Sequence, residues 1–128
     1  MLIKQIFKRL SLLLVSLALP AAGAFAHHSF AAFDMTKQET FSGKVVEVQY
    51  KNPHAWLFVD VEDGEKTVTY AIELGGPNIL MRQGWMVDTV KVGDLVSIQM
   101  NPMKDPTKKG GSLVALKQAS GKVFGTWK

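Results

Sequence analysis

Residues 54–74 read HAWLFVDVEDGEKTVTYAIEL, and this stretch decides the fold. Its side chains alternate in character on both sides of Asp63-Gly64, a pair that favours a tight hairpin turn. We therefore expect two antiparallel strands, residues 54–62 and 66–74, that share one core-facing side. That side carries Ala55, Leu57, Val59, Val61, Val68, Tyr70, Ile72 and Leu74.

The segments around this hairpin complete the pattern. Residues 41–50 are rich in β-branched residues and lead into a turn at Lys51-Asn52-Pro53, so they form an earlier strand. Gly75-Gly76-Pro77 ends the hairpin and opens a short helix that stops at Gly84. Two further strands are expected at residues 95–100 and 112–119.

Three strands, a helix and two strands follow one another in the order of an OB-fold. The sequence therefore predicts an all-β protein, a small OB-fold-like, five-stranded Greek-key barrel with one short helix between strands three and four. A generic small barrel or a β-sandwich is the alternative, although too few strands are visible for a seven-stranded sandwich.

The first 26 residues have the composition of a signal peptide. Lys4, Lys8 and Arg9 form a charged start, and residues 10–19 form an apolar run that is too short to span a bilayer. Ala24-Phe25-Ala26 then presents a cleavage pattern of small residues. We expect a periplasmic or secreted protein that consists of a signal peptide (1–26), an N-terminal arm (27–40), the barrel (41–119) and a C-terminal tail (120–128). Phe30 and Phe33 are expected to dock the arm.

Charge and cysteine content restrict the partners. The chain has 15 basic and 11 acidic residues, and removal of the three basic residues of the leader leaves 12 against 11. A nearly neutral exported chain lacks the basic character of nucleic-acid-binding proteins, so we expect no nucleic acid as partner. The absence of cysteine excludes a lipid-modified N-terminal cysteine, so we expect no stable membrane anchor after cleavage.

The three histidines indicate a metal site. Cleavage after Ala26 would make His27 the first residue, and its α-amine and imidazole could then chelate one ion. This resembles the histidine brace of exported copper proteins. His28 or His54 would add a third nitrogen, and such nitrogen sets suit Cu(II), so copper is the predicted cofactor. The alternative is that the two adjacent histidines belong to a solvated arm and that His54 caps a turn.

A second cleavage pattern, Ala22-Gly23-Ala24, leaves the metal geometry open. Cleavage after Ala24 would place His27 third in the mature chain, after Phe25 and Ala26. A histidine in third position resembles the amino-terminal Cu(II)/Ni(II) motif. Either cleavage site gives a copper ligand set.

Aromatic and charged side chains indicate a second possible site. Trp56 and Phe58 lie on the outer face of their strand near Glu73, and OB-folds bind ligands on the face of strands two and three. Arg82 and Trp85 follow the Gly-Gly-Pro turn and could bind an anion or form a cation–π contact. The alternatives are that the arm or the tail covers Trp56 and Phe58, and that Trp85 caps the barrel.

These features leave three classes of function open. A metal- or ligand-binding protein is the first, and a non-catalytic module that docks on an envelope protein through its aromatic face is the second. The third is an enzyme that uses a copper brace. No catalytic triad or phosphate-binding loop is present in the sequence. Three lysines are expected in a solvated loop, namely Lys104, Lys108 and Lys109.

Three motifs occur in order along the mature chain. They are His27-His28-Ser29-Phe30, Asn52-Pro53-His54-Ala55-Trp56, and Glu73-Leu74-Gly75-Gly76-Pro77 followed by Arg82-Gln83-Gly84-Trp85. Together they resemble a bacterial family of small exported proteins that is known as a domain of unknown function. The resemblance covers essentially the whole mature chain. It implies export and a compact β-rich domain, and it implies no activity.

Overall fold

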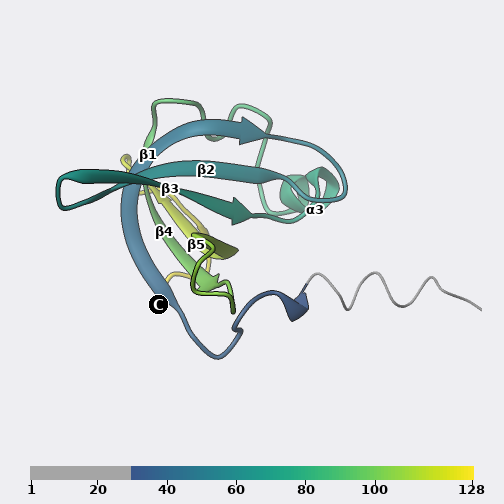
Figure 1. Cartoon of the computed structure of the whole chain (residues 1–128). Coiled ribbons are helices and arrows are strands. Elements are labelled where there is room, and N and C mark those ends of the chain that lie inside the picture. Colours follow the sequence, from purple (N-terminus) through teal and green to yellow (C-terminus); the bar gives the residue numbers. More distant parts are fainter. Residues whose placement is uncertain (1–29) are drawn as a thin grey trace, which may run out of the picture. The chain divides into compact units, whose positions relative to one another are not determined.

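The computed structural model describes residues 30–128, and residues 31–128 form one compact unit. Within the described residues, six strands and the helix α3 follow one another (Figure 1). They are β1 (Glu39–Gln49), β2 (Trp56–Asp63), β3 (Lys66–Glu73), α3 (Pro77–Arg82), β4 (Leu95–Pro102), β5 (Gly110–Gln118) and β6 (Val123–Gly125). Among the described residues there is no helix of the length and apolar character needed to cross a membrane.

The strands close into a barrel. Their order in the sheet is β3-β2-β1-β4-β5-β6, and a parallel pairing between β3 and β5 joins the two sides. The first half of β1 pairs with β4 and its second half with β2, so this long strand bends across the molecule (Figure 1). The helix α3 stands between β3 and β4 in the chain. The predicted OB-fold-like barrel is therefore confirmed, with β6 as an additional short strand beside β5.

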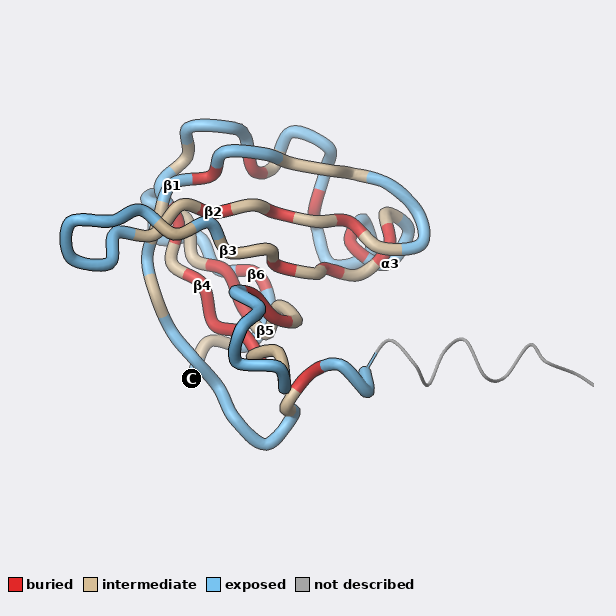
Figure 2. The backbone as a smooth tube through the Cα atoms, viewed as in Figure 1, coloured by how far each residue is buried: buried red, intermediate tan, exposed pale blue. Residues whose placement is uncertain are grey.

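The hairpin that decides the fold forms as predicted. Trp56 lies opposite Glu73 and Asp63 opposite Lys66, so the two strands are antiparallel over their whole length. Leu57, Val59 and Ile72 are fully buried in the core. The predicted inward face is not buried evenly, because Tyr70 and its neighbour on that face, Val68, are only partly covered (Figure 2).

One end of the barrel is closed by apolar side chains from α3 and the segment after it. Pro77 begins the helix, as the sequence predicts, and Leu80 is buried against the core. Trp85 is buried next to Phe124 of β6, with ring centroids 4.7 Å apart. We refer to this as the α3 end of the barrel.

Residues 31–38, the described part of the N-terminal arm that belongs to the barrel unit, precede β1 and lie away from the α3 end. Phe33 is buried and forms an isolated β-bridge with Met103, which confirms that this ring docks the arm. Phe30 is 59% exposed, and its docking stays a prediction. The C-terminal tail lies against β4, where the main-chain oxygen of Lys128 accepts a hydrogen bond from the side-chain amide of Gln99.

Candidate functional site

His54 lies in the loop between β1 and β2, beside the end of β3. Its Nδ1 atom is 3.1 Å from the carbonyl oxygen of Leu74 and 3.2 Å from Oε1 of Glu73. The His54 side chain is 37% exposed and that of Glu73 only 13%. The imidazole is therefore held at one nitrogen by two oxygen atoms while part of the ring remains open to solvent.

These two contacts determine which nitrogen carries the proton. A backbone carbonyl oxygen and a carboxylate oxygen are both acceptors, so Nδ1 of His54 has to be the donor. In the neutral imidazole the proton then sits on Nδ1, and Nε2 presents its lone pair. Metal-binding histidines are commonly oriented in this way, by a carboxylate or a backbone carbonyl on the second ring nitrogen.

Backbone contacts bring two of the sequence motifs together around His54. The Ala55 amide donates to the Gly75 carbonyl at 3.2 Å, and the Leu74 amide donates to the Ala55 carbonyl at 2.8 Å. Gly76 allows the loop to approach closely, because a Cβ atom at this position would lie 2.7 Å from the carbonyl oxygen of Pro53. The motifs around residues 52–56 and 73–77 therefore lie side by side in the fold, although they are far apart in the sequence.

The residues of the predicted aromatic site differ in their exposure, and the site stays a prediction. Trp56 and Phe58 are half-buried on the outer side of β2, and Trp56 lies opposite Glu73. Arg82 is exposed on the last turn of α3. Trp85 is 4% exposed and its ring packs on Phe124, which is the arrangement expected of the alternative in which Trp85 caps the barrel.

The described residues do not form a complete metal centre by themselves. Among residues 30–128 there is no cluster of three or more histidine, cysteine, aspartate or glutamate side chains that could hold an ion. His54 and Glu73 contribute two such side chains. His27 and His28, the other predicted ligands, lie outside the described residues.

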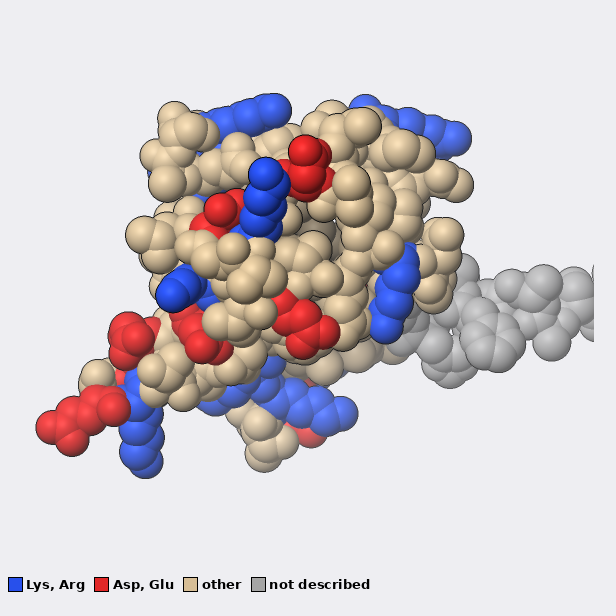
Figure 3. All heavy atoms as spheres, turned by 90° about the horizontal axis from the view of Figure 1, so that it is seen from above, with Lys and Arg blue, Asp and Glu red and all other residues tan. Residues whose placement is uncertain are grey.

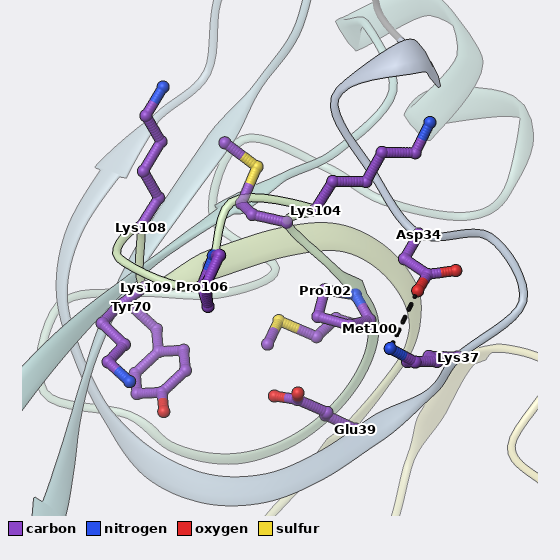
Figure 4. A pocket seen from close by; sticks show the side chains of 12 residues that line it. Asp34, Lys37, Glu39, Tyr70, Met100, Pro102, Lys104, Pro106, Lys108 and Lys109 are labelled. Carbon is purple, nitrogen blue, oxygen red and sulfur yellow. Dashed lines mark ion pairs between the residues drawn. The ribbon is translucent and has the colours of Figure 1, made fainter.

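The structure reveals a cavity that the sequence did not predict. It has a volume of about 420 Å³ and lies where the arm, the start of β1, the middle of β3 and the β4–β5 loop meet (Figure 4). We call it the barrel mouth. It is lined by Asp34, Lys37, Glu39, Tyr70, Met100, Pro102, Met103, Lys104, Pro106, Lys108, Lys109 and Gly110.

Charges at the barrel mouth are distributed unevenly. Lys37 forms an ion pair with Asp34, with Nζ 3.2 Å from Oδ2. The pKa of Asp34 is lowered chiefly by hydrogen bonds from the side chain and amide of Thr36, and also by Lys37. Of the ion pairs among residues 30–128, none involves Glu39 or Lys109. The position of this loop between strands four and five of an OB order was the one sequence signal that could have indicated a site here.

Comparisons with known proteins agree with this fold. A family model described as a family of unknown function (DUF6152) matches residues 13–112. A crystal structure of the mitochondrial single-stranded DNA-binding protein Rim1 from S. cerevisiae is similar at 12% identity and a TM-score of 0.50, and the match covers 72% of this chain and 98% of that chain. A second crystal form gives 11% identity, coverage of 68% and 79%, and a TM-score of 0.44. No curated protein matches the sequence.

These comparisons confirm the resemblance to a family of unknown function and correct the predicted partners. The sequence led us to expect an envelope protein as partner and no nucleic acid, whereas the solved structure that shares this fold is that of a mitochondrial single-stranded DNA-binding protein. Net charge was too coarse a criterion, because an OB barrel can present a nucleotide-binding face whatever the total charge of the chain. Trp85 was also expected to contribute to the surface that docks on an envelope protein, but it is buried.

Proposed function

We propose that this chain, which belongs to the DUF6152 family of unknown function, is an exported OB-barrel protein that binds one Cu(II) ion. The ligands in this proposal are Nε2 of His54 and the α-amine and imidazole of His27 after cleavage at Ala26. His28 is the alternative source of an imidazole. Glu73 acts as a positioning residue, since it holds the ring of His54 through the opposite nitrogen.

The observation that carries this proposal is the double contact of Nδ1 of His54. A histidine that only capped a turn would need one acceptor, whereas this ring faces both the Leu74 carbonyl and the Glu73 carboxylate. The pair fixes the tautomer and the direction of the ring, and it leaves the Nε2 lone pair for a ligand. Imidazole and amine nitrogens favour Cu(II) in tetragonal geometry.

Copper titration of the exported protein, purified after cleavage of its own leader, tests the proposal. Calorimetry should show one Cu(II) per chain. His27→Ala and an additional residue ahead of His27 should both weaken binding sharply, because each removes a ligand nitrogen. Glu73→Gln should weaken binding by roughly 10- to 100-fold, as loss of a residue that orients a metal-bound histidine does in other proteins.

A matched control separates the site from the fold. Lys109→Met changes an exposed residue at the barrel mouth and should leave copper affinity unchanged. His54→Ala should reduce copper affinity without changing the far-ultraviolet circular dichroism. Equal affinities for proteins with free and blocked N-termini would remove the proposal, and so would an unchanged affinity of His54→Ala.

A further inference from the structure

We propose that the barrel mouth binds a small zwitterion, a molecule that carries an amine and a carboxylate on an apolar body, such as an amino acid. This site shares no residue with the proposed copper site. The proposal rests on the arrangement of charges across the cavity, on its apolar lining and on contacts that hold its walls in place.

Opposite charges face the cavity from different elements. In Figure 4 the Lys109 amine and the Tyr70 hydroxyl lie on one side of the cavity, and the Glu39 carboxylate lies on another. Among residues 30–128 neither Lys109 nor Glu39 forms an ion pair. A ligand carboxylate can therefore bind Lys109 and Tyr70, while a ligand amine binds Glu39.

The remaining lining favours an apolar body between the two charged groups. Met100 is buried and presents its thioether to the cavity, and Pro102 and Pro106 add apolar surface (Figure 4). The ring of Tyr70 is held by Phe41, with centroids 4.7 Å apart. A volume of about 420 Å³ lies near the lower end of the range for small-molecule sites.

The arm side of the cavity is held by hydrogen bonds. Asn101 is 6% exposed, and its side-chain amide donates to the Lys37 carbonyl at 2.7 Å. The Asp34 amide donates to the Pro102 carbonyl at 2.8 Å, and the Lys104 amide donates to the Ala32 carbonyl at 2.9 Å. The wall that carries Lys37 and Glu39 is therefore in place before any ligand binds.

The loop side is equally constrained. Oδ1 of Asp105 accepts hydrogen bonds from the amide of Thr107 at 3.0 Å and from its hydroxyl at 2.6 Å. Gly110 has a φ of +146°, and a Cβ atom there would lie 2.1 Å from the Ala71 carbonyl oxygen. The Ala71 amide donates to the Lys109 carbonyl at 3.2 Å, which fixes the backbone of Lys109 beside Tyr70.

A polyanion such as single-stranded nucleic acid fits this cavity less well. Two carboxylates, Asp34 and Glu39, line it, and Lys104 and Lys108 point away from its centre (Figure 4). On the upper face of the molecule, which does not include the mouth, basic and acidic side chains are interspersed (Figure 3). A phosphate backbone would therefore meet negative charge inside the mouth.

Calorimetry of the purified protein with defined probes tests the inference. The probes are leucine, 6-aminohexanoate, acetate, methylamine and oligothymidylate. Leucine or 6-aminohexanoate, which separate amine and carboxylate by different lengths, should bind more tightly than acetate or methylamine. Lys109→Met and Glu39→Gln should each weaken that binding by about tenfold or more, as expected for loss of a charged hydrogen-bond partner. Lys91→Met, a change in an exposed lysine that does not line the mouth, should leave it unchanged.

Three outcomes would overturn the inference. One is that neither zwitterion binds at millimolar concentration, and another is that both variants retain the affinity of the wild type. The third is that oligothymidylate binds through Lys109 while the zwitterions do not. His54→Ala should leave zwitterion binding intact, so failure at the mouth and failure of the copper proposal are distinguishable.

Discussion

The two ends of the barrel are closed by different kinds of interaction. At the α3 end, Leu80 and Trp85 are buried against the core, and the indole of Trp85 packs on Phe124. At the barrel mouth, the arm is docked by the buried ring of Phe33 and is further held by hydrogen bonds, among them that from buried Asn101 to the Lys37 carbonyl. The α3 end is filled by packed side chains, whereas the barrel mouth contains a cavity of about 420 Å³.

This difference separates stability from binding within one barrel. Apolar burial is non-directional and excludes water, so it stabilises the fold wherever side chains can pack. Hydrogen bonds from a few fixed groups hold a segment in place without filling the volume beneath it. We infer that the α3 end contributes more to the free energy of unfolding than the mouth does, and that the mouth has room to bind a ligand.

The largest effect is expected from Trp85→Ala. Removal of the buried indole should lower the free energy of unfolding by about 3–5 kcal/mol, because transfer energy is lost and a cavity remains beside Phe124. Urea unfolding followed by circular dichroism measures this loss. Arg82→Ala, an exposed change in the same segment, should cost no more than about 0.5 kcal/mol. Similar losses for the two variants would contradict the assignment of Trp85 to the core.

A smaller effect is expected at the mouth from Asn101→Leu. This change keeps the number and branching of the side-chain heavy atoms and removes the donor to the Lys37 carbonyl, so the free energy of unfolding should fall by about 1–3 kcal/mol. Hydrogen exchange should also become faster at the Asp34 amide, which bonds to Pro102.

Gln99 provides the matched control for Asn101. Gln99 is also buried, at 5% exposure, but its side-chain amide donates to the Lys128 carbonyl in the tail. Gln99→Leu should release the tail and leave exchange at Asp34 unchanged. If both variants accelerate exchange at Asp34 equally, the arm is not held by Asn101 in particular.

The sequence predicts the elements that depend on local patterns. Alternation over residues 54–74 predicted the β2–β3 hairpin, and Pro77 predicted the start of α3, because period and turn chemistry are properties of neighbouring residues. The order of these elements was then sufficient to identify an OB-type barrel.

The barrel mouth could not be predicted in the same way. Its walls come from Lys37, Tyr70 and Lys109, which are far apart in the chain and meet only after β3 and β5 pair. The same holds for the contact of His54 with Glu73, since residue spacing alone does not show that the β1–β2 loop folds onto the end of β3. The sequence also left open whether Trp85 binds a ligand or caps the barrel, because a tryptophan after a turn looks the same in the sequence whether it packs inward or outward.

The smallest effect concerns acid stability, and it should be confined to the mouth. The pKa of Asp105 is lowered chiefly by the hydrogen bonds from Thr107, and that of Asp34 chiefly by those from Thr36. A carboxyl group with a lowered pKa in the folded state stabilises the fold above its unfolded pKa, near 3.9 for aspartate. It loses that contribution as the pH falls through the pKa of the folded state.

Asp34→Ala and Asp105→Ala should therefore be less stable than the wild type at pH 6, and their stability should approach that of the wild type towards pH 2. Urea unfolding across this range measures the convergence, and Trp85→Phe at the α3 end should differ from the wild type by the same amount at every pH. A constant difference for the aspartate variants would show that their carboxylates act by packing rather than by charge.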